Sequence, residues 1–214
     1  MSINLYHGDC LEAMKEMPDN AYDLAIVDPP YGIGADKKRG DTGKNKHIKQ
    51  KDYHFGDWDS SIPSKEYFQE LQRVSKNQII WGGNYFLDYL LATNCFIVWN
   101  KVNGENRYAD CELAWASFKT AVRKFTWRWH GFLQQGEKEQ RIHPTQKPVK
   151  LYEWLLDNYA EPNQRILDTH LGSGSIALAC HNRGFSLDAW EIDAEYHANA
   201  VKRFNQHIAQ LTIF

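Results

Sequence analysis

Residues 165–179 read RILDTHLGSGSIALA: a short apolar run that ends in an aspartate, a turn with two glycines, and an apolar segment of helical length. A second apolar run at 186–190 reads SLDAW and ends in Glu191. Strand, turn, helix and strand in this order form a parallel βαβ unit. Glycine lets the backbone turn tightly and lets a ligand approach it closely. This stretch therefore predicts the nucleotide-binding half of an open α/β sheet.

Two details of the sequence restrict the class of ligand that this unit can bind. Glu191 follows Asp168 at about the 20-residue spacing at which an acid accepts hydrogen bonds from a ribose diol. The turn lacks the third glycine of the full GxGxxG motif, because Ile176 and Ala177 follow Ser175. The full motif binds a pyrophosphate. The sequence therefore favours a ligand with an adenosine but no pyrophosphate, and S-adenosylmethionine fits that description.

A second motif lies near the N-terminus. Residues 24–27 read LAIV, a continuous apolar run typical of a strand that is buried on both faces. The run ends in Asp28-Pro29-Pro30-Tyr31, at the strand end where open α/β sheets bind ligands. Asp28 and the carbonyl of Pro29 can accept the two hydrogens of an exocyclic amino group, which favours a nitrogen pyramidal enough to attack. The prolines fix the backbone, and Tyr31 can stack on a base. The alternative is a rigid turn with no chemistry.

The remaining pattern predicts the architecture. Strands are expected at 3–6, 78–81, 95–99, 113–117, 121–127 and 165–167, and helices at 11–17, 64–75, 148–158, 175–182 and 195–210. The alternation predicts a doubly wound, mostly parallel α/β sheet with an antiparallel edge strand, in a single domain spanning 1–214. The alternating aromatics Phe125, Trp127 and Trp129 are expected to form a half-buried strand in the sheet core.

Composition and charge limit the class of protein. The chain has 214 residues, 43% hydrophobic and 24% charged, which suits one globular domain with a substantial core. The four cysteines and nine histidines show no ligand spacing, so no metal site and no disulfide framework are expected. No signal peptide and no apolar run of membrane-spanning length occur, so we expect a cytoplasmic protein.

The net charge of −2 hides one basic segment. A long polar loop is predicted at 32–61, and its basic residues cluster directly after the Asp28 motif. A charge run is commonly a solvated surface, but a nucleic-acid binder must be basic somewhere. The DNA-contact candidates are Lys37, Lys38, Arg39, Lys44 and Lys46.

Together with His143-Pro144-Thr145-Gln146-Lys147-Pro148, the two motifs resemble the beta class of amino-methylating DNA methyltransferases, of phage or prophage type. The order, catalytic motif before cofactor motif, is what indicates the beta class. The resemblance runs from Leu5 to about Tyr196. It implies a Rossmann-like methyltransferase fold, S-adenosylmethionine as cofactor and double-stranded DNA as partner.

The resemblance also implies residue roles. Asp168 and the glycine turn should line the methionine part of the cofactor, and Lys147, with Thr145 and Gln146, should lie near its carboxylate. Glu191 should hold the ribose hydroxyls, and Asp9, with Cys10, should meet the adenine. The implied catalytic residues are Asp28, Pro29, Pro30 and Tyr31, and the implied cofactor-binding residues are Asp9, Cys10, Asp28, His143, Thr145, Gln146, Lys147, Asp168, His170, Gly172, Ser173, Gly174, Ser175, Glu191 and Ile192. The chain departs from the family at two positions of this motif, since the family commonly has Asp-Pro-Phe where this chain has Asp168-Thr169-His170. His170 is therefore either a hydrogen-bond donor or a packing residue.

The predicted reaction is methylation of N6 of a flipped adenine, because in the family Asp before Pro-Pro-Tyr favours adenine. N4 of cytosine is the alternative; an RNA or protein amine and a catalytically idle DNA-binding or cofactor-binding protein are the others. The sequence contains no Pro-Cys dipeptide, so a cysteine nucleophile for methylation of a ring carbon is not indicated. Sequence recognition is expected from insertions at about 32–61 and 100–142, with Asn103, Arg107 and Arg128 as candidate contacts. A short recognition site or a homodimer is expected, and either a restriction endonuclease counterpart or a solitary phage or prophage enzyme is compatible.

Overall fold

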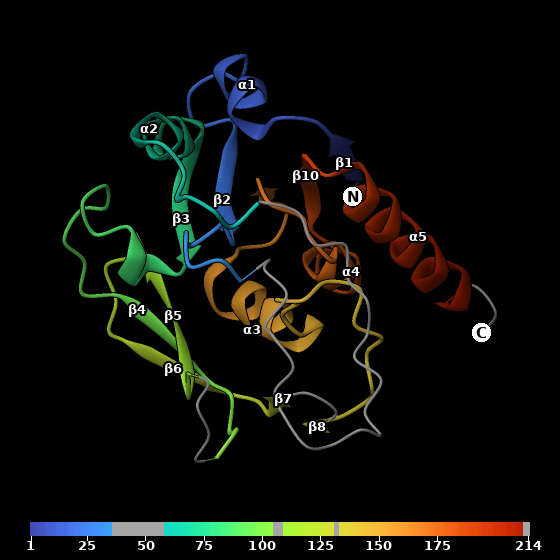
Figure 1. The fold of residues 1–214 in the computed structure, drawn as a ribbon. Helices are drawn as coiled ribbons and strands as arrows, with labels where there is room; N and C mark the ends of the chain where they lie inside the picture. Colours follow the sequence, from blue (N-terminus) through green and yellow to red (C-terminus); the bar gives the residue numbers. More distant parts are fainter. Residues whose placement is uncertain (36–57, 105–108, 131–132, 212–214) are drawn as a thin grey trace.

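The computed structural model describes residues 1–35, 58–104, 109–130 and 133–211 (Figure 1). In this part of the chain, eight strands form one sheet in the order β1-β10-β9-β2-β3-β5-β4-β6. Their bounds are β1 Ile3–His7, β2 Tyr22–Val27, β3 Ser75–Trp81, β4 Phe96–Asn100, β5 Cys111–Ala116, β6 Arg123–Thr126, β9 Arg165–Asp168 and β10 Ser186–Glu191. A small hairpin pairs β7 (Trp129–His130) with β8 (Leu133–Gln134). The helices are α1 Cys10–Lys15, α2 Lys65–Val74, α3 Val149–Tyr159, α4 Ser175–Arg183 and α5 Ala194–Leu211, and a 3₁₀ turn spans Gly83–Tyr85.

Five neighbouring strands, β1, β10, β9, β2 and β3, are parallel, so their carboxyl ends share one edge of the sheet. The antiparallel strand is β5, and it lies between β3 and β4. The prediction of an antiparallel edge strand was therefore wrong in position, because β4 and the parallel pair β4·β6 continue the sheet beyond it. Burial explains the order: Ala114, Trp115 and Ala116 of β5 are buried, whereas β6 is largely exposed and suits an edge.

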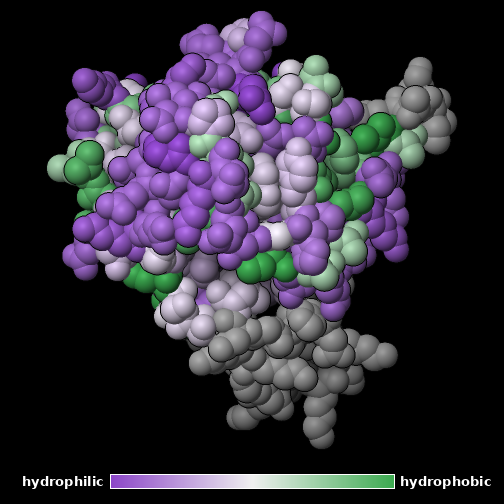
Figure 2. Space-filling view, turned by 90° about the horizontal axis from the view of Figure 1, so that it is seen from above, coloured by the Kyte–Doolittle hydropathy of each residue, from purple (hydrophilic) through white to green (hydrophobic). Residues whose placement is uncertain are grey.

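Each face of the sheet carries its own hydrophobic core. In β2, Leu24 and Ile26 pack with α3 and α4, while Ala25 and Val27 pack with α2 on the opposite face. A strand covered on both faces needs apolar residues at every position, which accounts for the continuous runs in the sequence. The face seen from above in Figure 2 is mostly hydrophilic, with smaller apolar patches.

The predicted strands and helices are present with shifts of a few residues at their ends. Ser64 caps α2 by accepting from the backbone N–H of Tyr67, and Asp9 caps α1. The aromatic alternation is the exception: Phe125 lies in β6, Trp127 follows it, and Trp129 belongs to β7. Only Trp129 is fully buried, while the other two pack at the margin of the core. The single strand predicted for them is therefore wrong.

The basic loop candidates Lys37, Lys38, Arg39, Lys44 and Lys46 and the candidate contact Arg107 lie outside the described residues. Within the described ranges, no helix is long and apolar enough to cross a membrane. The same ranges contain no cluster of three or more residues with metal-ligating side chains, and all four cysteines are free thiols.

Candidate active site

Acidic side chains stand at the ends of four neighbouring parallel strands. Asp9 follows β1, Glu191 ends β10, Asp168 ends β9 and Asp28 follows β2, in the order of the strands across the sheet. These residues come from both halves of the chain, and the parallel topology brings them to one edge. A ligand lying along this edge meets carboxylates that can accept hydrogen bonds from hydroxyls and attract cationic groups.

The glycine turn is held from two sides. Gly172 and Gly174 have left-handed backbone angles, with φ of 52° and 73°. Glu191 accepts from the Gly172 N–H at 2.8 Å through Oε2, and from the Asp193 N–H at 3.0 Å through Oε1. Arg203 of α5 donates to the carbonyl of Ser173 at 2.8 Å. These hydrogen bonds hold the turn from both sides, and Arg203 is a support that the sequence motifs did not indicate.

Asp168 carries a strongly perturbed carboxyl group. It is buried at the end of β9, and its Oδ1 accepts from the His170 N–H at 3.0 Å. Burial raises the pKa of Asp168 to about 8, and the carboxylates of Asp28 and Glu191 add to the shift. A cation bound beside Asp168 would relieve this repulsion, so the acid suits a positively charged ligand.

The ring of His170 is packed against its neighbours and makes a hydrogen bond through Nδ1. Its Nδ1 lies 2.9 Å from Thr169 Oγ1, and its ring meets the ring of Tyr67 edge-on at 5.4 Å. Burial lowers the pKa of His170 to about 4, so the ring is neutral at pH 7. Thr169 Oγ1 also lies 2.6 Å from the Tyr67 hydroxyl, and this contact links the residues after β9 to α2.

We expect Asp168→Asn to raise the melting temperature more at pH 8 than at pH 5. The folded carboxyl titrates near pH 8 and the unfolded one near pH 4, so the unfolded chain binds fewer protons between these values. Stability therefore falls as pH rises through this window, and an uncharged amide removes that loss. Melting curves of both proteins across pH 4–9 measure it; parallel curves would contradict the assignment. Asn should also weaken binding of S-adenosylmethionine.

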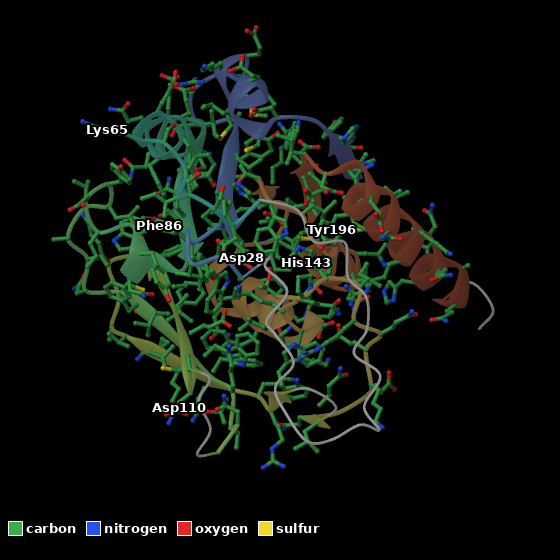
Figure 3. All side chains as sticks on the ribbon, viewed as in Figure 1. Asp28, Lys65, Phe86, Asp110, His143 and Tyr196 are labelled. Atoms are coloured by element: carbon green, nitrogen blue, oxygen red, sulfur yellow. The ribbon has the colours of Figure 1, made fainter. Side chains whose placement is uncertain are left out.

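The Asp28 carboxylate has a partner on each oxygen. The Tyr31 hydroxyl donates to Oδ1 at 2.6 Å, and the Lys147 ammonium donates to Oδ2 at 2.5 Å. The Tyr31 ring stacks on Tyr85 with centroids 5.1 Å apart. The Asp28 side chain keeps 19% of its surface exposed, so a substrate can reach it. Figure 3 shows Asp28 near the middle of the molecule, where β2 ends.

The segment from His143 to Lys147 joins the two halves of the site. His143 lies beside the glycine turn, and its ring meets Tyr196 of α5 with centroids 4.3 Å apart (Figure 3). Lys147, at the other end, contacts Asp28. Gln146 is buried, and its Oε1 accepts from the Ile142 N–H at 2.9 Å, so its amide supports the segment. The expected position of Thr145, Gln146 and Lys147 beside a cofactor carboxylate stays a prediction.

The sequence reasoning missed Asp59, which braces the turn that follows β2. Asp59 is 1% exposed, and its Oδ1 accepts from the backbone N–H groups of Tyr31 at 2.6 Å and Gly32 at 2.9 Å. Its Oδ2 accepts from the Ala35 N–H at 2.7 Å. A carboxylate that gathers three backbone donors fixes the conformation of residues 31–35. Nothing local in the sequence signals this contact, because the bonded residues lie 24 to 28 positions away.

We expect Asp59→Asn to destabilise the fold by about 1–3 kcal/mol, because the amide nitrogen would face the Ala35 N–H instead of accepting from it. Urea unfolding monitored by tryptophan fluorescence measures this change. Asp88→Asn, at an exposed aspartate, is the control and should stay within about 0.5 kcal/mol of the parent. Equal stabilities for the two variants would show that Asp59 is dispensable.

Two further residues were missed because they act over long range. A Cβ at Gly82 would lie 2.2 Å from the Tyr31 ring, so the glycine makes room for that ring. Glu112 of β5 lies 3.2 Å from the Lys147 ammonium and also pairs with Lys101. Neither a glycine after a strand nor an acid in an edge-like strand is a specific signal in one sequence.

Comparisons with known proteins show similarity to DNA methyltransferases. A family model described as DNA methylase, for N6- and N4-methylating enzymes, matches residues 99–202. Type II methyltransferase M2.MboI of Moraxella bovis is 26% identical over 220 residues, covering 83% of this chain and 78% of that protein. Type II methyltransferase M.HinfI of Haemophilus influenzae is 24% identical, covering 93% and 67%.

Two solved structures share the fold. The M1.HpyAVI–SAM complex superposes with a TM-score of 0.58 at 24% identity, covering 94% of this chain and 99% of that one. The PvuII DNA methyltransferase, named as cytosine-N4-specific, has a TM-score of 0.63 at 15% identity, covering 95% and 86%. The predicted Rossmann-like methyltransferase fold and the resemblance to amino-methylating DNA methyltransferases are confirmed by these findings.

Proposed function

We propose that this chain, a member of the amino-methylating DNA methylases, transfers a methyl group from S-adenosylmethionine to the N6 amino group of an adenine in double-stranded DNA. The observation that carries the proposal is the shared sheet edge, where the Asp28 turn and the Asp168 glycine turn stand at neighbouring strands β2 and β9. Direct methyl transfer requires that the residues that accept hydrogen bonds from the amino group lie next to the site that binds the nucleoside.

The residues along the edge fit S-adenosylmethionine. Glu191 keeps free lone pairs for two ribose hydroxyls, and Asp168 offers a carboxylate to the cationic methionine part. Asp9, Cys10 and the exposed side chain of Ile192 lie at the ends of β1 and β10, where the adenine is expected. When bound, the cofactor supplies an electrophilic methyl group on a sulfonium whose sulfur keeps the electron pair of the broken bond.

The residues of the catalytic turn, Asp28 to Tyr31, orient the nucleophile and take up its proton. Asp28 and the Pro29 carbonyl each accept one hydrogen of the amino group, which directs the nitrogen lone pair toward the methyl group. Each carboxylate oxygen has two acceptor sites, so Asp28 can accept from the base while it keeps Tyr31 and Lys147. Once the N–C bond has formed, the nitrogen carries one proton in excess, and Asp28 is the base that receives it.

Aromatic rings offer a stacking surface for the flipped base. Tyr31 and Tyr85 lie face to face, and Tyr85 is 43% exposed. Base stacking on an aromatic ring contributes about 1–3 kcal/mol, which offsets the cost of unstacking the base in the duplex. The rings therefore support a substrate that is a nucleobase rather than a small amine.

The partners are part of the proposal. The chain acts as one domain in the cytoplasm, with DNA contacts from the insertions near 32–61, including Lys37, Lys38, Arg39, Lys44 and Lys46, and near 100–142. These segments are small, so the enzyme reads a short site or works as a homodimer. It serves either beside a restriction endonuclease or as a solitary phage or prophage enzyme.

Methylation of N4 of cytosine is the second candidate, because the PvuII enzyme with the same fold is named as cytosine-N4-specific. Expression in a methylation-free host, followed by modification-sensitive sequencing of the genomic DNA, separates the two. N6-methyladenine at one recurring motif supports the proposal. N4-methylcytosine would correct the base and keep the mechanism. Unmodified DNA, with cofactor binding demonstrated, would refute a DNA substrate.

A further inference from the structure

Lys147 is surrounded by oxygen atoms. Its ammonium lies 2.5 Å from Asp28 Oδ2, 3.2 Å from the Tyr31 hydroxyl and 3.2 Å from Glu112 Oε2, and its side chain is 3% exposed. Its charge also lies 5.4 Å from the ring centre of Trp81, which is fully buried. A lysine side chain loses considerable conformational freedom when it is held in this way, so these contacts must fix its position together.

Glu112 is the contact that comes from outside the catalytic turn. It lies in β5, opposite Trp99 of β4, and its second carboxylate oxygen pairs with Lys101. Its Oε2 is buried and, apart from the Lys147 ammonium, has no hydrogen-bond partner among the described residues. Cations and anions therefore alternate in a series of ion pairs that runs from Lys101 through Glu112 and Lys147 to Asp28.

We propose that Glu112 is a positioning residue for methyl transfer, which acts through Lys147 to hold the Asp28 carboxylate in the plane that receives the amino group. The inference rests on the proposed function. Tyr31 and Lys147 each hold one Asp28 oxygen, and together they stop the carboxylate from rotating. Without Glu112, only Asp28 would hold the Lys147 ammonium by charge, and the ammonium could draw the carboxylate away from the base.

The charges around Lys147 give the proposal a second consequence. Burial works to lower the pKa of Lys147, but the carboxylates of Asp28 and Glu112 outweigh burial and raise it. Lys147 therefore stays a donor at neutral pH and is no base for the reaction. Further titratable groups near Lys147 are His143, Asp168 and the hydroxyl of Tyr31, and Lys101 faces Glu112. Removing the charge of Glu112 should lower the pKa of Lys147 and loosen Asp28 at a lower pH.

The test compares the full-length protein with Glu112→Gln. We expect kcat to fall about 10- to 100-fold, as for a small misplacement of a reacting group, with the KM for DNA and the cofactor Kd within about threefold. The alkaline limb of the kcat profile should move down by about one pH unit or more. Glu112→Asp restores the charge and should restore the position of that limb, with a several-fold loss of kcat from its shorter reach.

Glu153→Gln is the matched control, since Glu153 is a buried glutamate of α3 paired with Lys150 and Asn182, and it makes no contact with Asp28. It should lower the melting temperature without moving the alkaline limb. An unchanged kcat and limb in Glu112→Gln would overturn the proposal, as would a raised cofactor Kd that accounts for the whole loss. Should Gln fail to fold, an undiminished kcat in Glu112→Asp overturns it.

A measurement without turnover keeps this inference separate from the proposed function. In protein labelled with ¹³C-lysine, the Cε resonance of Lys147 reports its titration. We expect a lower pKa in Glu112→Gln than in the parent, and an equal pKa would overturn the coupling. If the parent methylates no DNA, the proposed function fails, while the NMR titration still decides whether Glu112 controls Lys147.

Discussion

Asp28→Ala should reduce the rate of methyl transfer by about 10²–10³-fold while leaving the Kd of S-adenosylmethionine within a factor of about three. In the proposed function Asp28 is the acceptor that orients the amino group and takes its proton, and alanine has no acceptor. The cofactor's own contacts are expected at Glu191 and Asp168, which bond to the backbone and not to Asp28. Transfer of a radiolabelled methyl group to DNA at saturating substrates gives the rate, and calorimetry gives the Kd.

Two companion variants separate chemistry from structure. Asp28→Asn keeps the shape of the side chain but removes its charge, and it should be nearly as inactive as alanine. Asp19→Ala removes an exposed aspartate whose partner is Arg73 and should keep the parent rate. If Asp28→Ala retains more than about a tenth of the activity, another group accepts the proton. A joint loss of cofactor binding would instead make Asp28 a cofactor residue.

The strands and their acids could be predicted from the sequence because the signal is local. A run such as residues 24–27 is apolar at every position only if both of its faces are covered, and both faces of β2 do pack against helices. Parallel strands share one carboxyl edge, so an acid directly after each run must lie near the others. Asp28, Asp168 and Glu191 were found in this way, without any knowledge of side-chain positions.

Strand order was beyond the same reasoning. Residues 113–117 and 121–127 were both predicted as short strands, and the pattern of apolar residues says which faces are buried but not which strand neighbours which. The antiparallel β5 lies inside the sheet, next to β3, and this places Glu112 within reach of Lys147. Because the position of β5 was predicted wrongly, the contact between Glu112 and Lys147 could not be predicted either.

The supporting contacts were unpredictable for a related reason. Lys147 and Asp28 are 119 positions apart, and Asp59 reaches back 28 positions to Tyr31. Polar residues of this kind have no periodicity, and in a single sequence a lysine in a motif indicates importance without naming its partner. The resemblance implies that Lys147 lies near a cofactor carboxylate, and only the structure shows that its ammonium also contacts Asp28. The acidic residues at the strand ends can be predicted from the sequence, but the residues that contact them are determined by tertiary packing.

Gly82→Ala should lower kcat about 10²-fold, with only a modest loss of stability. Gly82 has φ of +69°, and a Cβ there would lie 2.2, 2.5 and 2.7 Å from three carbons of the Tyr31 ring. The left-handed backbone strains alanine by about 1–2 kcal/mol, and the tyrosine must also move away from Asp28 and Tyr85. The radiolabelled transfer assay gives kcat, and thermal unfolding gives the stability.

Gly184→Ala is the matched control, because Gly184 ends α4 with φ of +75° and open space around its Cβ position. It should carry the same backbone strain and keep the parent kcat. A double-mutant cycle then locates the cause. If Gly82 acts by seating Tyr31, adding Gly82→Ala to a Tyr31→Ala protein should cost little further activity, since no ring remains to be displaced. Full additivity of the two losses would mean that Gly82 serves the site through the backbone of β3 and its turn instead of through the tyrosine.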